Sequence, residues 1–261
     1  SLLGIPTKDS ESLKHAVSVG KKESGAEFCA PLTAFHGHVR QLSQSCDALF
    51  LPVYLEKKDP GRQDRIRKYC YYTQFDASLA SAMLDKLEKK PQIISPVFKD
   101  RSNSRLVKEA LYKALATIYG DLIEKETLFS AWDKAQAFFE RYQNELKASW
   151  VPPSKDSIAV ALLGRPYTVL PASMNKGIPA IFQKLGVPVS YQDSLGDDNV
   201  RDNEVESLLD QVHWRYAADI LAKAAFCART EGLYPVFISS FKCAPDSFVL
   251  EYLSRIMDRS G

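Results

Sequence analysis

The stretch that decides the fold is SIAVALLG, residues 157–164, in which Ile158 to Leu163 are all apolar. A run that is hydrophobic on both faces is typical of a buried strand in a parallel sheet. A helix-like segment, NKGIPAIFQKLG, follows at 175–186, and a second short strand-like run, VPVSYQ, at 187–192. Strand, helix and strand in this order predict one repeat of a parallel α/β sheet.

The same alternation extends in both directions along the chain. Short runs rich in Val, Ile, Leu and Phe alternate with segments in which apolar residues recur at helical spacing. We therefore expect an α/β fold with two Rossmann-like lobes, each built on a parallel sheet. The further strands are expected at 47–55, 92–98 and 233–241, and the further helices at 32–44, 76–90 and 204–226.

The middle of the chain differs from both flanks. Residues 101–150 contain no strand-like run, and two amphipathic helix patterns fill them. The segment VPPSKDS then breaks the helical pattern with two prolines. We expect a first lobe at 1–100, a helical connector at 101–150 and a second lobe at 151–261. Both ends look cut, so we expect a piece of a longer polypeptide.

Composition narrows the class of protein. Hydrophobic residues make up 45% and charged residues 25% of the chain, as in globular proteins, and the net charge is +2. This small charge gives no support to a nucleic-acid or anionic-membrane partner. No apolar run is long enough for a transmembrane helix, and no secretory leader is visible. We expect a cytoplasmic protein.

The chain has five cysteines, an odd number that argues against a disulfide framework in a cytoplasmic protein. FCAP at 28–31 and KCAP at 242–245 repeat one pattern, in which a proline marks a helix start just after Cys29 and Cys243. Cys70 also precedes a predicted helix. Free N–H groups and the helix dipole favour thiolates and an anionic cluster there. Three such ligands would leave one iron of a four-iron cluster open.

Competing interpretations apply to each cysteine, because cysteine is often only a small buried apolar residue. We expect this role for Cys46, at a helix–strand junction, and for Cys227, at the end of an apolar helix face, although Cys227 as a further ligand stays open. His36 and His38 are two positions apart on one predicted helix and point in different directions, so they are not expected to share a metal.

A second candidate site is the loop after the 157–164 strand, since α/β proteins bind ligands at the carboxyl ends of strands. Arg165 and Asn175, at the two ends of this loop, are the candidate cofactor-binding residues. Arg165 either holds an anion or forms an ion pair across the lobe interface. The basic run at 57–68 is interpreted as a surface loop that permits docking of an acidic partner. We find no Walker A or G-x-G-x-x-G motif and assign no catalytic residue.

Five segments together resemble a known family. The set resembles the 2-hydroxyacyl-CoA dehydratase-related proteins, and most closely the carboxyl-terminal region of large acyl-CoA dehydratase activase-related proteins. The segments are FCAPLTAFHGHVRQL, DALFLPVYLE, RKYCYYTQF, LLGRPYTVLPASMNKGIPAIFQKLGVPV and GLYPVFISSFKCAPDSFVLEYLSRIMD.

This resemblance implies a 4Fe-4S cluster on Cys29, Cys70 and Cys243, in a cleft between α/β domains. It implies an ATPase activator domain of the acetate kinase/Hsp70 type as electron donor, in the same full-length chain. A dehydratase-like subunit or a second copy is a further implied partner. The family's first and last strands are expected outside this chain.

Two hypotheses follow for function. The first is an iron–sulfur redox module that takes low-potential electrons from an ATP-driven activator and works in an ATP-dependent reductase or dehydratase-type system. The alternative is a cluster-free docking domain within a larger multidomain protein. A thiol hydrolase is disfavoured, because the chain shows no convincing order of Cys, His and Asp.

Overall fold

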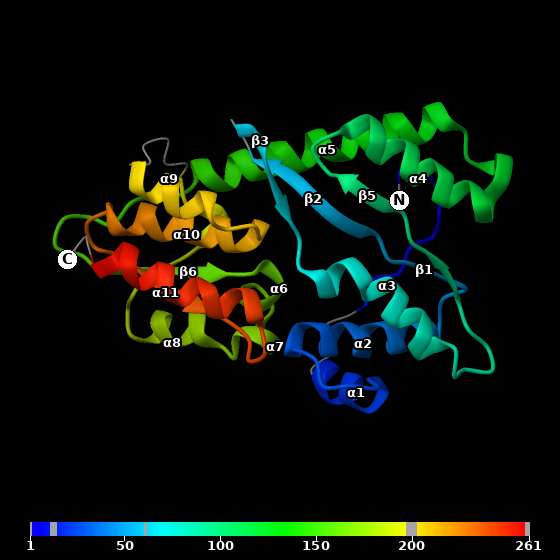
Figure 1. Cartoon of the computed structure of the whole chain (residues 1–261), viewed down its shortest axis with the longest axis horizontal. Coiled ribbons are helices and arrows are strands. Elements are labelled where there is room, and N and C mark those ends of the chain that lie inside the picture. Colours follow the sequence, from blue (N-terminus) through cyan, green and yellow to red (C-terminus); the bar gives the residue numbers. More distant parts are fainter. Residues whose placement is uncertain (1, 11–14, 60–61, 197–202, 259–261) are drawn as a thin grey trace. The chain divides into compact units, whose positions relative to one another are not determined.

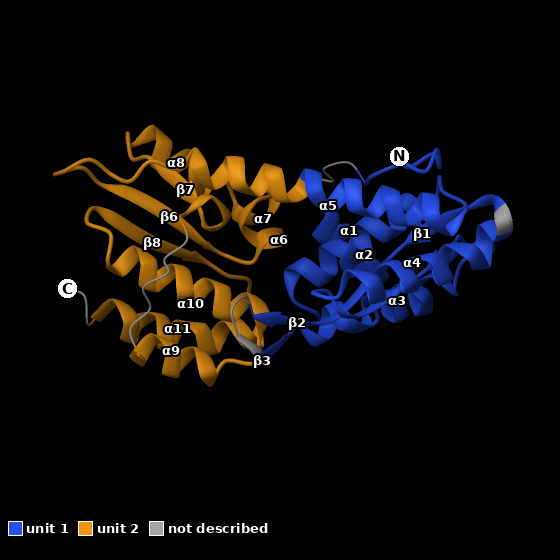
Figure 2. Cartoon of the chain, turned by 90° about the horizontal axis from the view of Figure 1, so that it is seen from above, with its two compact units in different colours: residues 1–138 blue, residues 139–261 orange. Residues whose placement is uncertain are grey.

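The chain forms two compact units, residues 1–138 and residues 139–261 (Figure 2). The computed structural model describes residues 2–10, 15–59, 62–196 and 203–258. The predicted α/β class is confirmed. The segment predicted as a helical connector forms helices α4 (Ser104–Tyr119), η1 (Gly120–Leu122) and α5 (Lys125–Ala148), and the division between the units falls within α5.

Unit 2, whose elements Figure 1 colours from green to red, is built on a parallel sheet of strand order β7-β6-β8 (Figure 2). Every residue of the central strand β6 (Ala159–Gly164) is buried, as its uninterrupted apolar sequence predicts. β6 pairs with β7 (Val189–Tyr191) on one side and with β8 (Leu233–Ile238) on the other. Gly164 faces Ile238 at the carboxyl ends of their strands, so the loops after β6 and β8 leave the sheet together.

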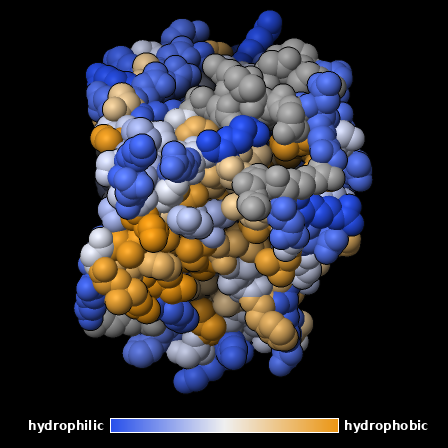
Figure 3. Space-filling model, turned by 90° about the vertical axis from the view of Figure 1, so that its left-hand side faces the viewer, coloured by the Kyte–Doolittle hydropathy of each residue, from blue (hydrophilic) through white to orange (hydrophobic). Residues whose placement is uncertain are grey.

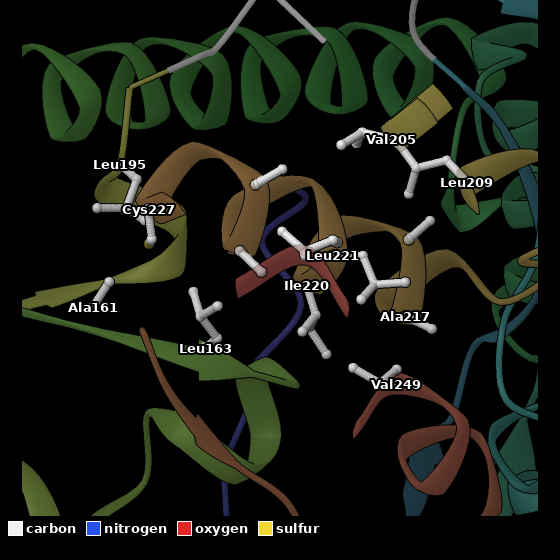
Figure 4. Close-up of a cluster of buried hydrophobic side chains, with 14 of the residues drawn as sticks. Ala161, Leu163, Leu195, Val205, Leu209, Ala217, Ile220, Leu221, Cys227 and Val249 are labelled. Carbon is white, nitrogen blue, oxygen red and sulfur yellow. The ribbon is translucent and has the colours of Figure 1, made fainter. Parts of the chain in front are cut away.

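The helices of unit 2 enclose its main core. Apolar side chains from β6, α10 and α11 meet in one cluster, in which Leu163, Ile220 and Leu221 are completely buried (Figure 4). Residues predicted as one helix at 204–226 form two helices, α9 and α10. The helices of this unit are α6 (Pro166–Val169), α7 (Ala172–Asn175), α8 (Ile178–Lys184), η2 (Gln192–Ser194), α9 (Asn203–Asp210), α10 (Arg215–Ala228) and α11 (Ala244–Asp258).

Two prolines divide the predicted strands of unit 1. The 47–55 run forms β1 (Ala48–Phe50) and β2 (Val53–Asp59), and the 92–98 run forms β4 (Gln92–Ile94) and β5 (Val97–Asp100). β1 pairs with β4 and β2 with β5, both in parallel and with the same sequence offset. In that register Pro52 lies opposite Pro96. Because proline has no N–H to donate, the ladder is interrupted at the same level on both strands.

The basic run at 57–68 is not a surface loop, which corrects the prediction. It forms most of an antiparallel hairpin of β2 and β3 (Arg62–Lys68), with an irregularity between Lys58 and Asp59. Arg67 is buried and its Nε lies 2.8 Å from Oδ2 of Asp59, and Arg65 lies 3.5 Å from the same oxygen. Part of the run's charge is therefore neutralised within unit 1, and the sheet of β3, β2 and β5 is mixed.

Cys29 and Cys70, two of the predicted ligands, stand directly before two helices of unit 1, and a third helix packs against the first of these. The three helices are α1 (Ala16–Glu23), α2 (Ala30–Ser43) and α3 (Tyr71–Leu84). α1 and α2 approach each other at two glycines: a Cβ on Gly20 would overlap the backbone carbonyl of Thr33, and one on Gly37 would overlap that of Ala16. This contact requires both residues to lack a side chain.

Among the helices that the structure describes, none combines the length and the apolar character needed to cross a bilayer. Large apolar side chains are nevertheless exposed on unit 2, and Figure 3 shows apolar residues gathered over the lower part of one face. The most exposed of them belong to short connections and helix ends and include Val151, Leu185 and Phe241.

Candidate functional site

The three predicted ligands all stand directly before a helix. Cys29 is the N-cap of α2 and Cys70 is the N-cap of α3. Cys243 immediately precedes α11, and its carbonyl oxygen accepts a hydrogen bond from the backbone N–H of Ser247 (3.2 Å). The predicted position of Cys29 and Cys243 is confirmed. In both cases the helix begins at the alanine before the proline rather than at the proline itself.

Within unit 1, an aromatic contact joins the helix starts that carry Cys29 and Cys70. The ring of Phe28, next to Cys29, packs edge-on against the ring of Tyr72, with 5.5 Å between their centroids. The side-chain amide of Gln74 also donates to the carbonyl of Tyr69 (2.9 Å) and so holds the segment before α3 against its first turn. Packing thus brings two of the three predicted ligand segments together.

Cys243 lies in unit 2, on the loop that follows β8. The residue before it, Lys242, has a left-handed backbone (φ 68°), which is unusual for a residue with a side chain and marks a locally constrained turn. Asp246, three residues further along, acts electrostatically on the Cys243 thiol. The direction of this cysteine is therefore fixed by the turn before it and the helix after it.

A buried ion pair supports this loop. Arg165 follows β6 directly and its Nε donates to Oδ1 of Asp246 (2.8 Å), and each side chain is only 3% exposed. Oδ2 of Asp246 accepts a hydrogen bond from the hydroxyl of Ser239 (2.7 Å). Arg165 thus forms an ion pair, but its partner lies in the same unit, so the predicted pair across the lobe interface is wrong.

Two tyrosines complete the surroundings of the guanidinium group. Nη1 of Arg165 donates to the hydroxyl of Tyr167 (3.1 Å), and the guanidinium lies 5.8 Å from the ring centroid of Tyr216. Burial by itself lowers the pKa of Arg165, but Tyr167, Asp246 and Cys243 raise it above its ordinary value. Arg165 is therefore a permanent buried cation.

The same surroundings act on the Cys243 thiol. Burial raises the pKa of Cys243 to about 12, and Arg165 acts in the opposite direction. The thiol is accordingly protonated at neutral pH. The thiolate expected at Cys243 from the sequence is therefore not favoured, because burial outweighs the attraction of Arg165.

Asn175, the other candidate for cofactor binding, uses its side chain inside the loop. Its Nδ2 donates to the carbonyl of Val169 (2.8 Å), and its Oδ1 accepts from the backbone N–H of Gly177 (2.9 Å). Asn175 is also buried. We infer that it holds the connection between α6 and α8, and a role toward a cofactor stays an untested prediction.

The remaining cysteines and His36 pack inside their units, in environments typical of structural residues. Cys227 lies in the main core of unit 2 (Figure 4), where burial raises its pKa to about 12. Cys46 is partly buried and packs against a core of unit 1. His36 is buried and 2.6 Å separates its Nδ1 from Oγ of Ser24, which itself donates to a backbone carbonyl. Since that hydroxyl has one proton, Nδ1 of His36 is the donor, and burial lowers the pKa of the imidazole.

Among residues 2–10, 15–59, 62–196 and 203–258, no three His, Cys, Asp or Glu side chains form a group that could hold a metal ion. The predicted ligands are divided between the units, with Cys29 and Cys70 in unit 1 and Cys243 in unit 2. Their assignment as one ligand set stays a prediction.

Sequence reasoning missed the partners of Arg165. Asp246, Tyr167 and Tyr216 were not predicted to surround its guanidinium group. The available signal was Asp246, an acidic residue at the third position of the helix that follows Cys243, where a carboxylate is favoured by the helix dipole.

Comparison with known proteins identifies a family. Residues 3–195 match the model of a family described as the CoA enzyme activase uncharacterised domain (DUF2229). No curated protein and no solved structure gives a match. The matched region contains Cys29, Cys70 and Arg165 and ends before Cys243. Since it spans most of the chain, the chain belongs to this CoA enzyme activase domain family.

Proposed function

We propose that this chain is the iron–sulfur redox module of an acyl-CoA dehydratase activase-related protein. The observation that carries the proposal is the position of Cys29, Cys70 and Cys243, each of which stands immediately before a helix. Cys46 and Cys227 do not share it. Membership in the CoA enzyme activase domain family supports the same class of system.

The donor set suits an iron–sulfur cluster. Thiolates are the usual protein ligands of such clusters, and backbone N–H groups near the sulfurs stabilise their negative charge. The first turns of α2, α3 and α11 each provide N–H groups without partners in their own helix. When bound, a 4Fe-4S cluster supplies one-electron transfer. The three cysteines would hold it, and Arg165 with Asp246 would orient Cys243.

The proposed partners follow from this class of system. An ATPase activator domain of the acetate kinase/Hsp70 type would deliver low-potential electrons to the module, from within the full-length chain. A dehydratase-like subunit or a second copy of the chain would accept them. These partners rest on the resemblance described above and on the family, and they are part of the proposal.

Iron content after anaerobic reconstitution tests the proposal. Cys29→Ser, Cys70→Ser and Cys243→Ser should each bind less iron and sulfide than the parent chain and should show an altered absorption spectrum. Cys46→Ser is the matched control and should bind as much as the parent. If all three variants keep full iron and an unchanged spectrum, the ligand assignment is wrong, and a cluster-free docking domain becomes the better description.

A further inference from the structure

Helix α1 is attached to unit 1 through a single neighbouring helix. It lies against α2 (Figure 1), and no other helix or strand that the structure describes shares more than a marginal contact with it. We propose that His36 is a proton-sensitive latch, which keeps α1 docked on α2 while its imidazole is neutral and releases α1 when the imidazole is protonated. Such a latch needs no metal and no cysteine, so it is independent of the proposed function.

The latch is built from the end of α1 and one side chain of α2. Ser24, the C-cap of α1, donates to the carbonyl oxygen of Gly20 through its backbone N–H (2.8 Å) and through its hydroxyl (2.7 Å). Since the single hydroxyl proton is used in this way, Oγ of Ser24 accepts a hydrogen bond from Nδ1 of His36, 2.6 Å away. The imidazole thus binds the last turn of α1 directly.

The other ring nitrogen makes the neutral imidazole the form that fits. Nε2 of His36 is buried and has no hydrogen-bond partner among the described residues, and the residue is only 2% exposed. With its proton on Nδ1, a neutral ring leaves a lone pair at Nε2. A protonated ring would instead bury a charge and an N–H without an acceptor, which costs more. The rings of Phe28 and Phe35 pack against the imidazole and offer it no carboxylate.

No neighbouring charge compensates a proton on His36. Burial is the one cause that lowers its pKa. Glu23 and Arg40 form an ion pair with each other between α1 and α2, with 3.2 Å between Nε and Oε1. The other charged or titratable groups on these two helices, at their N-caps, and on α3 beside Phe28 are His15, Lys21, Lys22, Cys29, His38 and Tyr72.

Acid should therefore open the latch. A histidine whose pKa is lower in the folded than in the unfolded state contributes stability that is fully present above pH 6.5 and is lost as the pH falls through the folded-state pKa. In the interval between the two pKa values, the ratio of released to docked α1 should rise by up to about tenfold per pH unit, because release permits uptake of one proton. Since α1 is held by α2 alone, we expect local release before unit 1 unfolds.

Hydrogen exchange of the intact 261-residue chain, followed by mass spectrometry between about pH 5 and pH 8 and corrected for the intrinsic exchange rate, tests the latch. Amides of residues 16–24 should lose protection as the pH falls, whereas amides of β6 in unit 2 should keep theirs. His36→Asn retains a side-chain N–H donor but takes up no proton, so this pH dependence should disappear. His38→Asn is the matched control and should keep it, because burial also lowers the pKa of His38 but no hydrogen bond links it to α1 in the described structure.

A second measurement needs no variant protein, since His36→Asn also removes the ring contacts with Phe28 and Phe35. In a nuclear magnetic resonance titration of the parent chain, His36 should take up its proton at the same pH at which α1 loses protection. Protonation of His36 while α1 stays protected would overturn the latch. So would unchanged protection of α1 across the whole range, or an equal loss in the parent and in His36→Asn. Coincident midpoints, with a loss that His38→Asn retains, support it.

Discussion

Asp76, on helix α3, shows how burial changes the chemistry of a single carboxyl group. Its Oδ1 is buried and has no hydrogen-bond partner within the described residues. Burial raises the pKa of Asp76 to about 6, against a smaller opposing effect of the Ala77 backbone N–H. A carboxyl group whose pKa is higher in the folded than in the unfolded state favours folding when protonated. The contribution of Asp76 to the free energy of unfolding is fully present below pH 3.8 and is lost as the pH rises through about 6.

Asp76→Asn should therefore stabilise the protein at neutral pH. We expect its free energy of unfolding at pH 7 to exceed that of the parent by roughly 1–2 kcal/mol, because one pKa unit corresponds to about 1.4 kcal/mol and the side chain is only partly buried. Urea denaturation between pH 3.5 and pH 8 measures this. The parent should lose stability relative to the variant between about pH 4 and pH 6, and parallel pH profiles would contradict the assignment.

Individual residues were predictable where the signal is local. The prolines in FCAP and KCAP mark helix starts, so the positions of Cys29 and Cys243 followed from their neighbours. The partner of Arg165 was not predictable in this way, because Asp246 is 81 residues away. Their contact depends on the register that places Gly164 opposite Ile238, and a single sequence does not show that register.

The contact between helices α1 and α2 depends on two glycines and gives a sharp test. A Cβ on Gly20 would overlap the Thr33 carbonyl, which is fixed in the backbone of α2 and cannot move aside like a side chain. Gly20→Ala and Gly37→Ala should each lower the free energy of unfolding by about 1–3 kcal/mol, the usual effect of overpacking.

Gly25→Ala is the matched control for this contact. Gly25 follows α1 in the connection to α2, and an added Cβ there meets no atom within 4 Å. Its effect should be within about 0.5 kcal/mol, as for ordinary surface changes. Thermal and denaturant unfolding of the three variants provide the comparison. Equal effects at Gly20 and Gly25 would show that α1 and α2 do not pack as described.

Among the helices and strands, the errors have identifiable physical causes. The 47–55 and 92–98 strands were predicted as single runs, but Pro52 and Pro96 divide them, because each removes a backbone donor. The β2–β3 hairpin was missed because its sequence is dominated by charged residues, without the apolar alternation that indicates a strand. Helix α3 begins at Tyr71 rather than near residue 76, so Cys70 occupies its N-cap position.

At the level of the whole chain, the proposed ligands are divided between two compact units. Unit 1 would supply Cys29 and Cys70, and unit 2 would supply Cys243. A ligand that binds only the folded state stabilises every part of the protein that must be folded to hold it. A cluster held by all three cysteines should therefore stabilise both units, whereas a cluster held by one unit should stabilise that unit alone.

Tryptophan fluorescence can follow the units separately, because Trp132 lies in unit 1 and Trp150 and Trp214 lie in unit 2. Trp150→Phe/Trp214→Phe reports on unit 1 and Trp132→Phe on unit 2. Reconstitution with iron and sulfide should raise the denaturant midpoint in both variants. A rise in only one of them would show that the ligands come from a single unit. The metal-free forms provide the baseline.

The cysteine N-caps imply a trade-off between ligation and helix stability. Neither Cys29 nor Cys70 makes a side-chain capping hydrogen bond to its helix, and serine, nearly identical in shape, is among the best capping residues. In iron-free protein, Cys29→Ser and Cys70→Ser should each raise the melting temperature, with a gain of about 1 kcal/mol in unfolding free energy. The substitutions expected to abolish iron binding would thus be the ones that strengthen the empty scaffold. Under our proposal, selection for the cluster retains sulfur at positions where selection for stability alone would favour oxygen.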